Sequence, residues 1–334
     1  MKVKIGVIGL GFVSQLAHLP SLHYNRKVSI VAICDSNLRL ANTIGDKYNI
    51  NNIFSSYEDM INKIDLDGII LAVNKNNTAE ISKFILSKGI NLLTEKPSAL
   101  NSLEASRLTK ISKKNKCVYL TGYMKRHDPG IISLEKELRK KNLGRLINVY
   151  YEHLSGDSYA FPFEYHVGKT RKEIKKSTLN KNFNSKKNNY LKFLNTHCHS
   201  INLLRYFLKK IDFKKSFLNE NGEGFINFKS GKINIILNNQ YSKSKNWREN
   251  IVFYFKQGTI RLDIVKPFLK NVSSKYLIYK FGKNTNLKTN HKPIWCFKKQ
   301  MDYFISLITN KKKNVNSHDS YKDILLIEKI FKIR

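Results

Sequence analysis

The chain has 334 residues, of which 41% are hydrophobic and 11% aromatic, so it can bury two separate cores. Its mean hydropathy is -0.41, and its longest apolar runs, such as Gly68–Val73, are far shorter than the roughly 20 residues of a membrane helix. The composition therefore argues against an integral membrane protein.

The 60 basic residues outnumber the 25 acidic ones and give a formal net charge of +35. A protein that binds nucleic acid usually concentrates such charge on one face or in a tail. Here the lysines run from Lys2 to Lys332 among asparagine and isoleucine, the residue set of A/T-rich codons. We attribute the charge first to this composition and second to attraction for phosphorylated or nucleotide-linked molecules. Specific nucleic-acid binding ranks last.

The N-terminus leads directly into a strand-like segment and shows no signal peptide, so we expect a cytoplasmic protein. The cysteines are scattered without a CxxC pair, which predicts reduced thiols rather than a disulfide framework or a zinc module. They are Cys34, Cys117, Cys198 and Cys296.

From Lys2 to about Thr121, short β-branched runs alternate with longer amphipathic stretches, as in repeated β-α-β units. The predicted strands are Val3–Ile8, Ser29–Cys34, Gly68–Val73, Asn91–Thr94 and Cys117–Thr121. The predicted helices are Val13–His23, Asn37–Tyr48, Asn77–Lys88 and Ser102–Asn115. The strands are nearly continuously apolar, as parallel strands covered on both faces are. We therefore predict an α/β fold in which residues 1–122 form a doubly wound Rossmann domain.

After Gly144 the pattern changes to successive strands separated by Gly-rich or Asn-rich turns. The strands are Leu146–Leu154, Phe213–Asn219, Gly224–Lys229, Lys232–Tyr241, Ile251–Lys256, Thr259–Ile264 and Tyr276–Phe281. The helices are Lys192–Leu208, Trp295–Thr309 and Asp319–Ile333. Residues 123–334 are thus predicted to form an α+β domain with an open, mainly antiparallel sheet, whose final helix packs back on the first domain. The polar stretch Ser155–Asn189 is either a mobile substrate loop or partly disordered.

A glycine-rich turn joins the first predicted strand to the first predicted helix, which is the context that a dinucleotide site requires. Gly9 permits the tight turn, and Gly11 lets the backbone approach a pyrophosphate. The anion then lies on the helix N-terminus at Phe12 and Val13, where amide groups and the helix dipole stabilise it. Ser14 occupies the third glycine position and is small enough to keep the helix close to the strand. A purely structural Gly-rich turn is the alternative.

Asp35 ends the second predicted strand, where a carboxylate can accept hydrogen bonds from the adenosine ribose hydroxyls. An ordinary turn aspartate is the alternative. A carboxylate at this position disfavours a 2'-phosphate, so NAD is the expected cofactor. NADP is the alternative, because Arg39 lies nearby in the sequence.

The tripeptide Glu95-Lys96-Pro97 follows a strand, at the sheet edge where doubly wound folds bind ligands. Oxidation of an alcohol needs a group that takes the hydroxyl proton beside the nicotinamide, and Lys96 can do so if its surroundings favour the neutral amine. Pro97 restricts the backbone of Lys96. A surface lysine is the alternative.

With these motifs, the segment Gly122–Pro129 and a later helix with a histidine, the chain resembles the glucose-fructose oxidoreductase / inositol dehydrogenase / rhizopine catabolism (Gfo/Idh/MocA) family. The resemblance implies a Rossmann domain, an open-sheet domain that contributes to oligomer contacts, and chemistry on sugars, cyclitols or sugar nucleotides. It also implies that Lys96 lies beside the reacting hydroxyl and that Glu95 and Pro97 line the nicotinamide side.

The predicted helix Lys192–Leu208 looks like the family's helix that carries an aspartate and, one turn later, a histidine. In an unbroken helix Asn195 and His199 share one face. His199 matches the catalytic histidine and could shuttle the proton with Lys96. Asn195 stands in place of the carboxylate; an amide can orient a hydroxyl but cannot take a proton. A metal site on His197 and His199 is disfavoured, since residues two apart on a helix point to different sides.

Further positions complete the expected site. Asn74 is expected near the nicotinamide ribose together with Lys75, in a turn where Thr78 replaces the family's usual histidine. Tyr123 and Arg126 are candidate substrate contacts, with a packing tyrosine and a solvated arginine as equal alternatives. His153 and the Ser155–Asn189 stretch are expected to influence substrate choice without an assigned role.

The leading hypothesis is an NAD(P)-dependent oxidoreductase that transfers a hydride between nicotinamide and a secondary hydroxyl or keto group of a sugar, sugar nucleotide or cyclitol. The alternative is a catalytically weak or inactive dinucleotide-binding sensor or scaffold of the same fold. We expect a small-molecule partner, no specific nucleic acid, no metal, and a homodimer or homotetramer.

Overall fold

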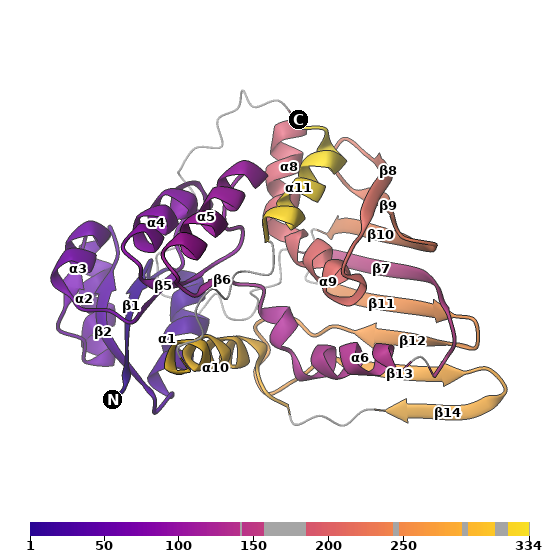
Figure 1. Ribbon diagram of the computed structural model, residues 1–334, viewed down its shortest axis with the longest axis horizontal. Coiled ribbons are helices and arrows are strands. Elements are labelled where there is room, and N and C mark those ends of the chain that lie inside the picture. The colour runs from indigo at the N-terminus through magenta and orange to yellow at the C-terminus, as the bar shows by residue number, and fades with distance from the viewer. Residues whose placement is uncertain (141, 157–184, 243–246, 289–292, 311–319, 334) are drawn as a thin grey trace. The chain divides into compact units, whose positions relative to one another are not determined.

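The computed structural model describes residues 1–140, 142–156, 185–242, 247–288, 293–310 and 320–333 (Figure 1). They divide into two compact units. The first contains Met1–Tyr123 and the described part of Phe297–Ile324. The second contains the described parts of Met124–His166, Ser177–Cys296 and Leu325–Arg334.

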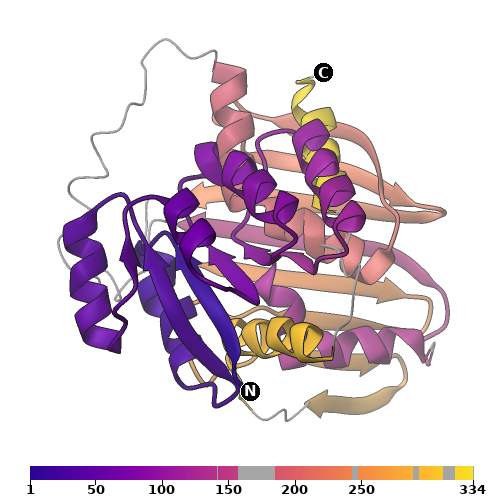
Figure 2. The same ribbon diagram turned by 60° about the vertical axis from the view of Figure 1, so that its left-hand side comes forward.

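The first unit is built on a six-stranded parallel sheet in the order β3-β2-β1-β4-β5-β6, drawn in indigo to purple in Figure 2. Its strands are β1 (Val3–Ile8), β2 (Val28–Cys34), β3 (Ile53–Phe54), β4 (Gly68–Leu71), β5 (Asn91–Thr94) and β6 (Tyr119–Thr121). Most of the central residues are buried, as the continuous apolar runs predicted. The order is that of a doubly wound dinucleotide-binding fold.

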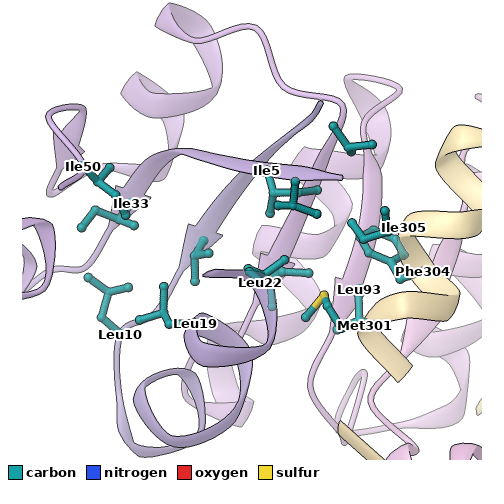
Figure 3. Packing of buried hydrophobic residues seen from close by; sticks show 14 of the residues in the cluster. Ile5, Leu10, Leu19, Leu22, Ile33, Ile50, Leu93, Met301, Phe304 and Ile305 are labelled. Carbon is teal, nitrogen blue, oxygen red and sulfur yellow. The ribbon is translucent and has the colours of Figure 1, made fainter. Parts of the chain in front are cut away.

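Helices cover both faces of this sheet. They are η1 (Ser14–His18), α1 (Leu19–His23), α2 (Leu38–Tyr48), α3 (Tyr57–Lys63), α4 (Lys75–Ser87), α5 (Ser102–Lys114) and α10 (Cys296–Thr309). One apolar cluster joins the sheet to α1, α2 and α10, and a second joins it to α3, α4 and α5. Figure 3 shows Met301, Phe304 and Ile305 of α10 packed beside Leu93 of the sheet. A helix from far along the sequence therefore completes the first core.

The second unit is built on an eight-stranded sheet in the order β14-β13-β12-β11-β7-β10-β9-β8. Its strands are β7 (Leu146–Gly156), β8 (Asp212–Leu218), β9 (Gly224–Ser230), β10 (Ile233–Ser242), β11 (Arg248–Phe255), β12 (Gly258–Asp263), β13 (Lys275–Lys280) and β14 (Lys283–Lys288). Among the described strands of this sheet, only β7 and β10 pair in parallel, and the other neighbours are antiparallel. The predicted fold class, a Rossmann domain plus an open and mainly antiparallel sheet, is confirmed.

Alternation along these strands defines a buried face and an outer face. Val149 and Tyr151 of β7 share the buried face with Ile251 and Phe253 of β11, to which they pair directly. The helical elements of this unit are η2 (Met124–His127), α6 (Pro129–Arg139), α8 (Ser185–Thr196), α9 (Cys198–Leu208) and the end of α11 (Ser320–Phe331). Helices α6 and α9 lie over one face of the sheet in Figure 1.

The segment that carries part of the family resemblance starts helix α6. Asp128 is the N-cap residue, and its carboxylate accepts hydrogen bonds from the amides of Gly130 and Ile131. Pro129 is the first helical residue, where its missing N–H leaves no helical bond unmade. The same carboxylate accepts from Ser274, which fixes the helix to the chain before β13.

Among the described residues, no helix is long and apolar enough to cross a membrane. All four cysteines are buried. The predicted Ser155–Asn189 loop lies mostly outside the described residues.

Candidate active site

The turn after β1 needs glycine at position 9. Gly9 has a φ of +85°, and a Cβ there would lie 2.4 Å from the Ala72 carbonyl oxygen. Its amide donates to the Cys34 carbonyl at 2.8 Å, at the carboxyl end of β2. Only glycine fits this left-handed, closely packed position.

Gly11 serves a different purpose from Gly9. A Cβ added at Gly11 would meet no heavy atom within 4 Å, so packing does not require glycine here. The missing side chain leaves the space above the turn open, next to the start of the helix at Phe12 and Val13. Ser14 is buried, and its hydroxyl donates to the Gly9 carbonyl, which secures the turn from below. An open cradle at a helix N-terminus fits the pyrophosphate of a dinucleotide.

Asp35 lies at the carboxyl end of β2 and is half-buried. One carboxylate oxygen accepts from the Leu10 amide at 2.7 Å, and the other accepts from the Asn37 amide at 2.9 Å. Each oxygen keeps a further lone pair, so the carboxylate is oriented by the glycine turn and can still accept from ribose hydroxyls. The sequence predicted the position of Asp35 but not its bond to the turn.

Asn74 is the N-cap residue of α4, and its side chain accepts from the Asn76 amide at 3.1 Å. Thr78 is buried and donates to the Asn74 carbonyl at 3.2 Å, so it packs inside the helix start. Burial, and to a lesser degree the charge of Lys96, lowers the pKa of Lys75. Asn74 and the two lysines therefore lie in one region.

Lys96 follows β5, and its peptide bond to Pro97 is cis. The Glu95 amide donates to Leu71 at the end of β4 at 2.8 Å, and Gly122 after β6 donates to Thr94 at 2.7 Å. Because β1, β4 and β5 are parallel neighbours, the glycine turn, Asn74 and Lys96 all meet at one edge of the sheet. This is the arrangement that the sequence predicted for the first unit.

The two candidate substrate residues lie in packed surroundings. Tyr123, at the end of the first unit, is 4% exposed. Arg126, in the second unit, donates to the side chain and the carbonyl of Asn202 at 2.5 and 3.2 Å and lies over the Tyr206 ring. Arg126 is therefore held against α9 rather than being a solvated arginine.

The predicted helix Lys192–Leu208 is helical throughout except at His197, where it is interrupted. The chain forms α8, leaves helical geometry at His197 (φ -99°, ψ 3°), and starts α9 at Cys198. Asn195 is exposed in the last turn of α8, whereas His199 is buried at the start of α9. Across this break, a spacing of four residues does not place Asn195 and His199 on one face. Both residues belong to the second unit, and Lys96 belongs to the first.

A buried polar centre in the second unit was not predicted. The Lys125 ammonium lies 2.5 and 2.6 Å from the Glu249 carboxylate oxygens, with the two side chains 4% and 0% exposed. Tyr151 also donates to Glu249. His153 Nδ1 lies 2.8 Å from the Ser200 hydroxyl. Strand alternation could have indicated this centre, since Glu249 pairs with His153 on the buried face.

His197 extends this centre from the break between the two helices. Its Nδ1 lies 3.1 Å from His153 Nδ1, and both rings are fully buried. Since two bare nitrogens repel, one of the two must carry the hydrogen. Among the described residues, no group of three or more His, Cys, Asp or Glu side chains could hold a metal ion.

Burial lowers the pKa of both His153 and His197 well below 6.5, and the Lys125 charge lowers both further. The folded state therefore favours the neutral rings, and its stability is full above pH 6.5 and falls as the pH drops below 6.5. We expect the free energy of unfolding to decrease below pH 6.5 by up to about 1.4 kcal/mol per pH unit for each ring. Urea denaturation between pH 7.5 and 5.5 measures this slope.

His153→Gln and His197→Gln should each reduce that slope, and His23→Gln, at an exposed position of α1, should not. An unchanged slope in both buried variants would contradict the assignment.

The first unit has the strand order, glycine turn and carboxylate of a dinucleotide-binding Rossmann domain, and the second is an open mixed sheet. Residues 3–123 match the family GFO_IDH_MocA, described as an oxidoreductase family with an NAD-binding Rossmann fold. Residues 3–123 are therefore similar to this family, and over these residues the resemblance inferred from the sequence motifs is confirmed.

Curated relatives agree over the same part of the chain. The inositol 2-dehydrogenase of Salmonella typhimurium is 27% identical over 161 residues, covering 47% of this chain and 48% of the relative. The rhizopine catabolism protein MocA of Rhizobium meliloti is 27% identical over 152 residues, covering 43% and 45%. The chain spans about half the length of the curated relatives that it matches.

Solved structures extend the likeness in fold to both units. KijD10, a 3-ketoreductase from Actinomadura kijaniata in complex with NADP and TDP-benzene, has a TM-score of 0.77 at 15% identity, covering 99% of this chain and 98% of that one. The dehydrogenase MviM from Clostridium difficile has a TM-score of 0.74 at 20% identity, covering both chains completely. At these identities the likeness shows the fold alone.

Proposed function

We propose that the chain is an NAD(P)-dependent oxidoreductase acting on a secondary hydroxyl or keto group of a sugar, sugar nucleotide or cyclitol. The observation that carries the proposal is the sheet edge of the first unit. There the open cradle at Gly11, the oriented carboxylate of Asp35 and the amine-bearing loop at Lys96 follow strands of one parallel sheet, in which the order is β2-β1-β4-β5.

In this proposal a bound nicotinamide supplies the hydride acceptor or donor. Lys96 takes the hydroxyl proton in oxidation and returns it in reduction. Glu95 and Pro97 line the nicotinamide side, and Asn74 contacts the nicotinamide ribose. His199 exchanges the proton with Lys96.

Asn195 and Arg126, both in the second unit, contact the substrate in this proposal. An amide donates and accepts, so Asn195 suits a sugar hydroxyl, and it cannot replace a carboxylate as proton acceptor. The named activities of the relatives, an inositol dehydrogenase and a ketoreductase with a bound TDP compound, support a polyol or sugar nucleotide.

NAD is the proposed cofactor in preference to NADP. Asp35 is held by two backbone amides beside the glycine turn, so its charge would oppose a 2'-phosphate. Arg39, exposed at the start of α2, keeps NADP as the second choice. A cytoplasmic location and a homodimer or homotetramer are parts of the same proposal.

A dinucleotide-binding sensor with little turnover is the second candidate. The observations that favour it are the amide at Asn195 and the side chain of Arg126, which is held by Asn202. Such a protein would keep the cofactor cradle and lack an efficient acid-base pair.

A panel of polyols, sugars and sugar nucleotides with NAD(H) and NADP(H), followed at the nicotinamide absorbance, tests the proposal. We expect turnover with at least one polyol or sugar nucleotide and a preference for NAD. Tight cofactor binding without turnover across the panel would favour the sensor. The absence of cofactor binding would contradict both candidates.

A further inference from the structure

A buried histidine links the helix after the glycine turn to the lysine loop. His18, the last residue of η1, is 2% exposed in its side chain, and its Nε2 lies 2.9 Å from an oxygen of Glu95, whose side chain is 15% exposed. The Phe297 ring packs edge-on against the imidazole with a centroid distance of 5.9 Å. Neither the sequence motifs nor the proposed function assigns His18 a role.

Each oxygen of the Glu95 carboxylate takes part in a hydrogen bond. Its second oxygen accepts from the backbone amide of Lys96 at 3.2 Å. A Cβ at Gly122 would lie only 3.0 to 3.1 Å from the carboxylate atoms, so the glycine provides the space that the carboxylate occupies. The Glu95 backbone is fixed separately by the bond of its amide to Leu71.

The hydrogen-bond chemistry sets the direction of the link. An ionised carboxylate only accepts, so the His18 Nε2 carries the hydrogen and donates it. A carboxylate that is largely removed from water needs its donors, because an unmade bond leaves the desolvation of the charge uncompensated. His18 therefore determines where the Glu95 carboxylate lies, and that carboxylate restrains the backbone of Lys96.

We propose that His18 is a positioning residue for Lys96, acting through Glu95. The helix that begins at the dinucleotide cradle thereby holds the loop that carries the catalytic amine. This inference rests on the proposed function. Without the His18 donor, the Glu95 carboxylate turns toward other donors, the Lys96 amide loses its acceptor, and the amine leaves its reactive position.

Two variants and a control test the link. In His18→Gln the amide nitrogen can take the place of Nε2 and donate to Glu95, whereas the shorter side chain of His18→Asn cannot reach. The control is His23→Asn, on the exposed side of the following helix α1. For His18→Asn we expect kcat to fall by about 100-fold with the KM for cofactor changed by less than about 3-fold. His18→Gln should recover most of the loss.

A second readout needs neither cofactor nor substrate. Hydrogen exchange of the peptide that spans residues 93–98, measured by mass spectrometry on the cofactor-free protein, reports the Lys96 amide. We expect this amide to exchange about 10-fold faster in His18→Asn than in the natural protein and in His23→Asn. The far-ultraviolet circular dichroism of each variant verifies the fold, and His18→Gln carries the test alone if His18→Asn does not fold.

The outcomes separate the inference from the proposed function. A natural protein without turnover contradicts the proposed function, and the exchange measurement still tests the link. Normal kcat and normal exchange in His18→Asn overturn the inference. If His18→Asn does not fold, His18→Gln is measured alone. In that case a loss of nearly all turnover together with fast exchange of the Lys96 amide overturns the inference. Equal losses in His18→Asn and His18→Gln also overturn it, since the donor would then not be the property that matters.

Discussion

Replacing Lys96 by alanine is expected to lower turnover by about 10³-fold, while the affinity for the dinucleotide changes little. The physical reason is that Lys96 is the amine at the sheet edge where the glycine turn and Asn74 converge, and the cofactor cradle at Gly9 and Gly11 is built without it. Steady-state kinetics and a fluorescence titration with the reduced dinucleotide measure the two quantities.

The matched control for this variant is Lys110→Ala, at an exposed position of α5. It should leave both turnover and cofactor affinity unchanged. Near-normal turnover of Lys96→Ala would contradict the assignment of the proton acceptor. A combined loss of turnover and cofactor binding would place Lys96 in the cofactor site instead.

Replacing Glu249 by alanine is expected to lower the free energy of unfolding by about 3 to 5 kcal/mol. The change leaves the Lys125 ammonium buried without its counter-charge, and it removes the acceptor of the Tyr151 hydroxyl. Chemical denaturation near pH 7.5, followed by tryptophan fluorescence, measures the effect.

Two further variants make the comparison specific. The double variant Lys125→Met with Glu249→Leu should be more stable than Glu249→Ala, because no charge then stays buried without a partner. Asp263→Ala removes the half-exposed pair of Asp263 and Arg261 and should change stability by less than about 1 kcal/mol. If Glu249→Ala were as mild as Asp263→Ala, the buried ion pair would not be a feature of the protein in solution.

The first unit could be predicted almost entirely from the sequence, because its signals are local. Continuous apolar runs predicted five of the six strands, and the glycine turn and Asp35 followed from their places at strand ends. The strand that was not predicted, β3, has two residues, and the helix α3 has seven. Neither is long enough to show a detectable periodicity. The hydrogen bond from His18 to Glu95 joins distant segments, and no local pattern contains it.

The second unit was predicted less completely, because its site depends on contacts between distant strands and helices. The periodicity of Lys192–Leu208 is continuous through His197, so no local pattern predicts the interruption there or the contact of His197 with His153 of β7. Glu249 and Lys125 are charged residues that sequence reasoning places at the surface. They are buried because each supplies the opposite charge and the hydrogen bonds that the other needs. Neither residue alone predicts this pairing.

The docking of α10 against the first sheet has a consequence for the order in which the chain can fold. Synthesis proceeds from the N-terminus, so the strands of the first unit emerge from the ribosome well before Met301, Phe304, Ile305 and Leu307. Until those residues are made, the face of the nascent sheet that α1 and α2 cover lacks the part of its cover that α10 provides, and that part is available to chaperones or to other chains. Completion of the dinucleotide-binding unit is therefore a late event in biosynthesis, although its motifs lie at the beginning of the sequence.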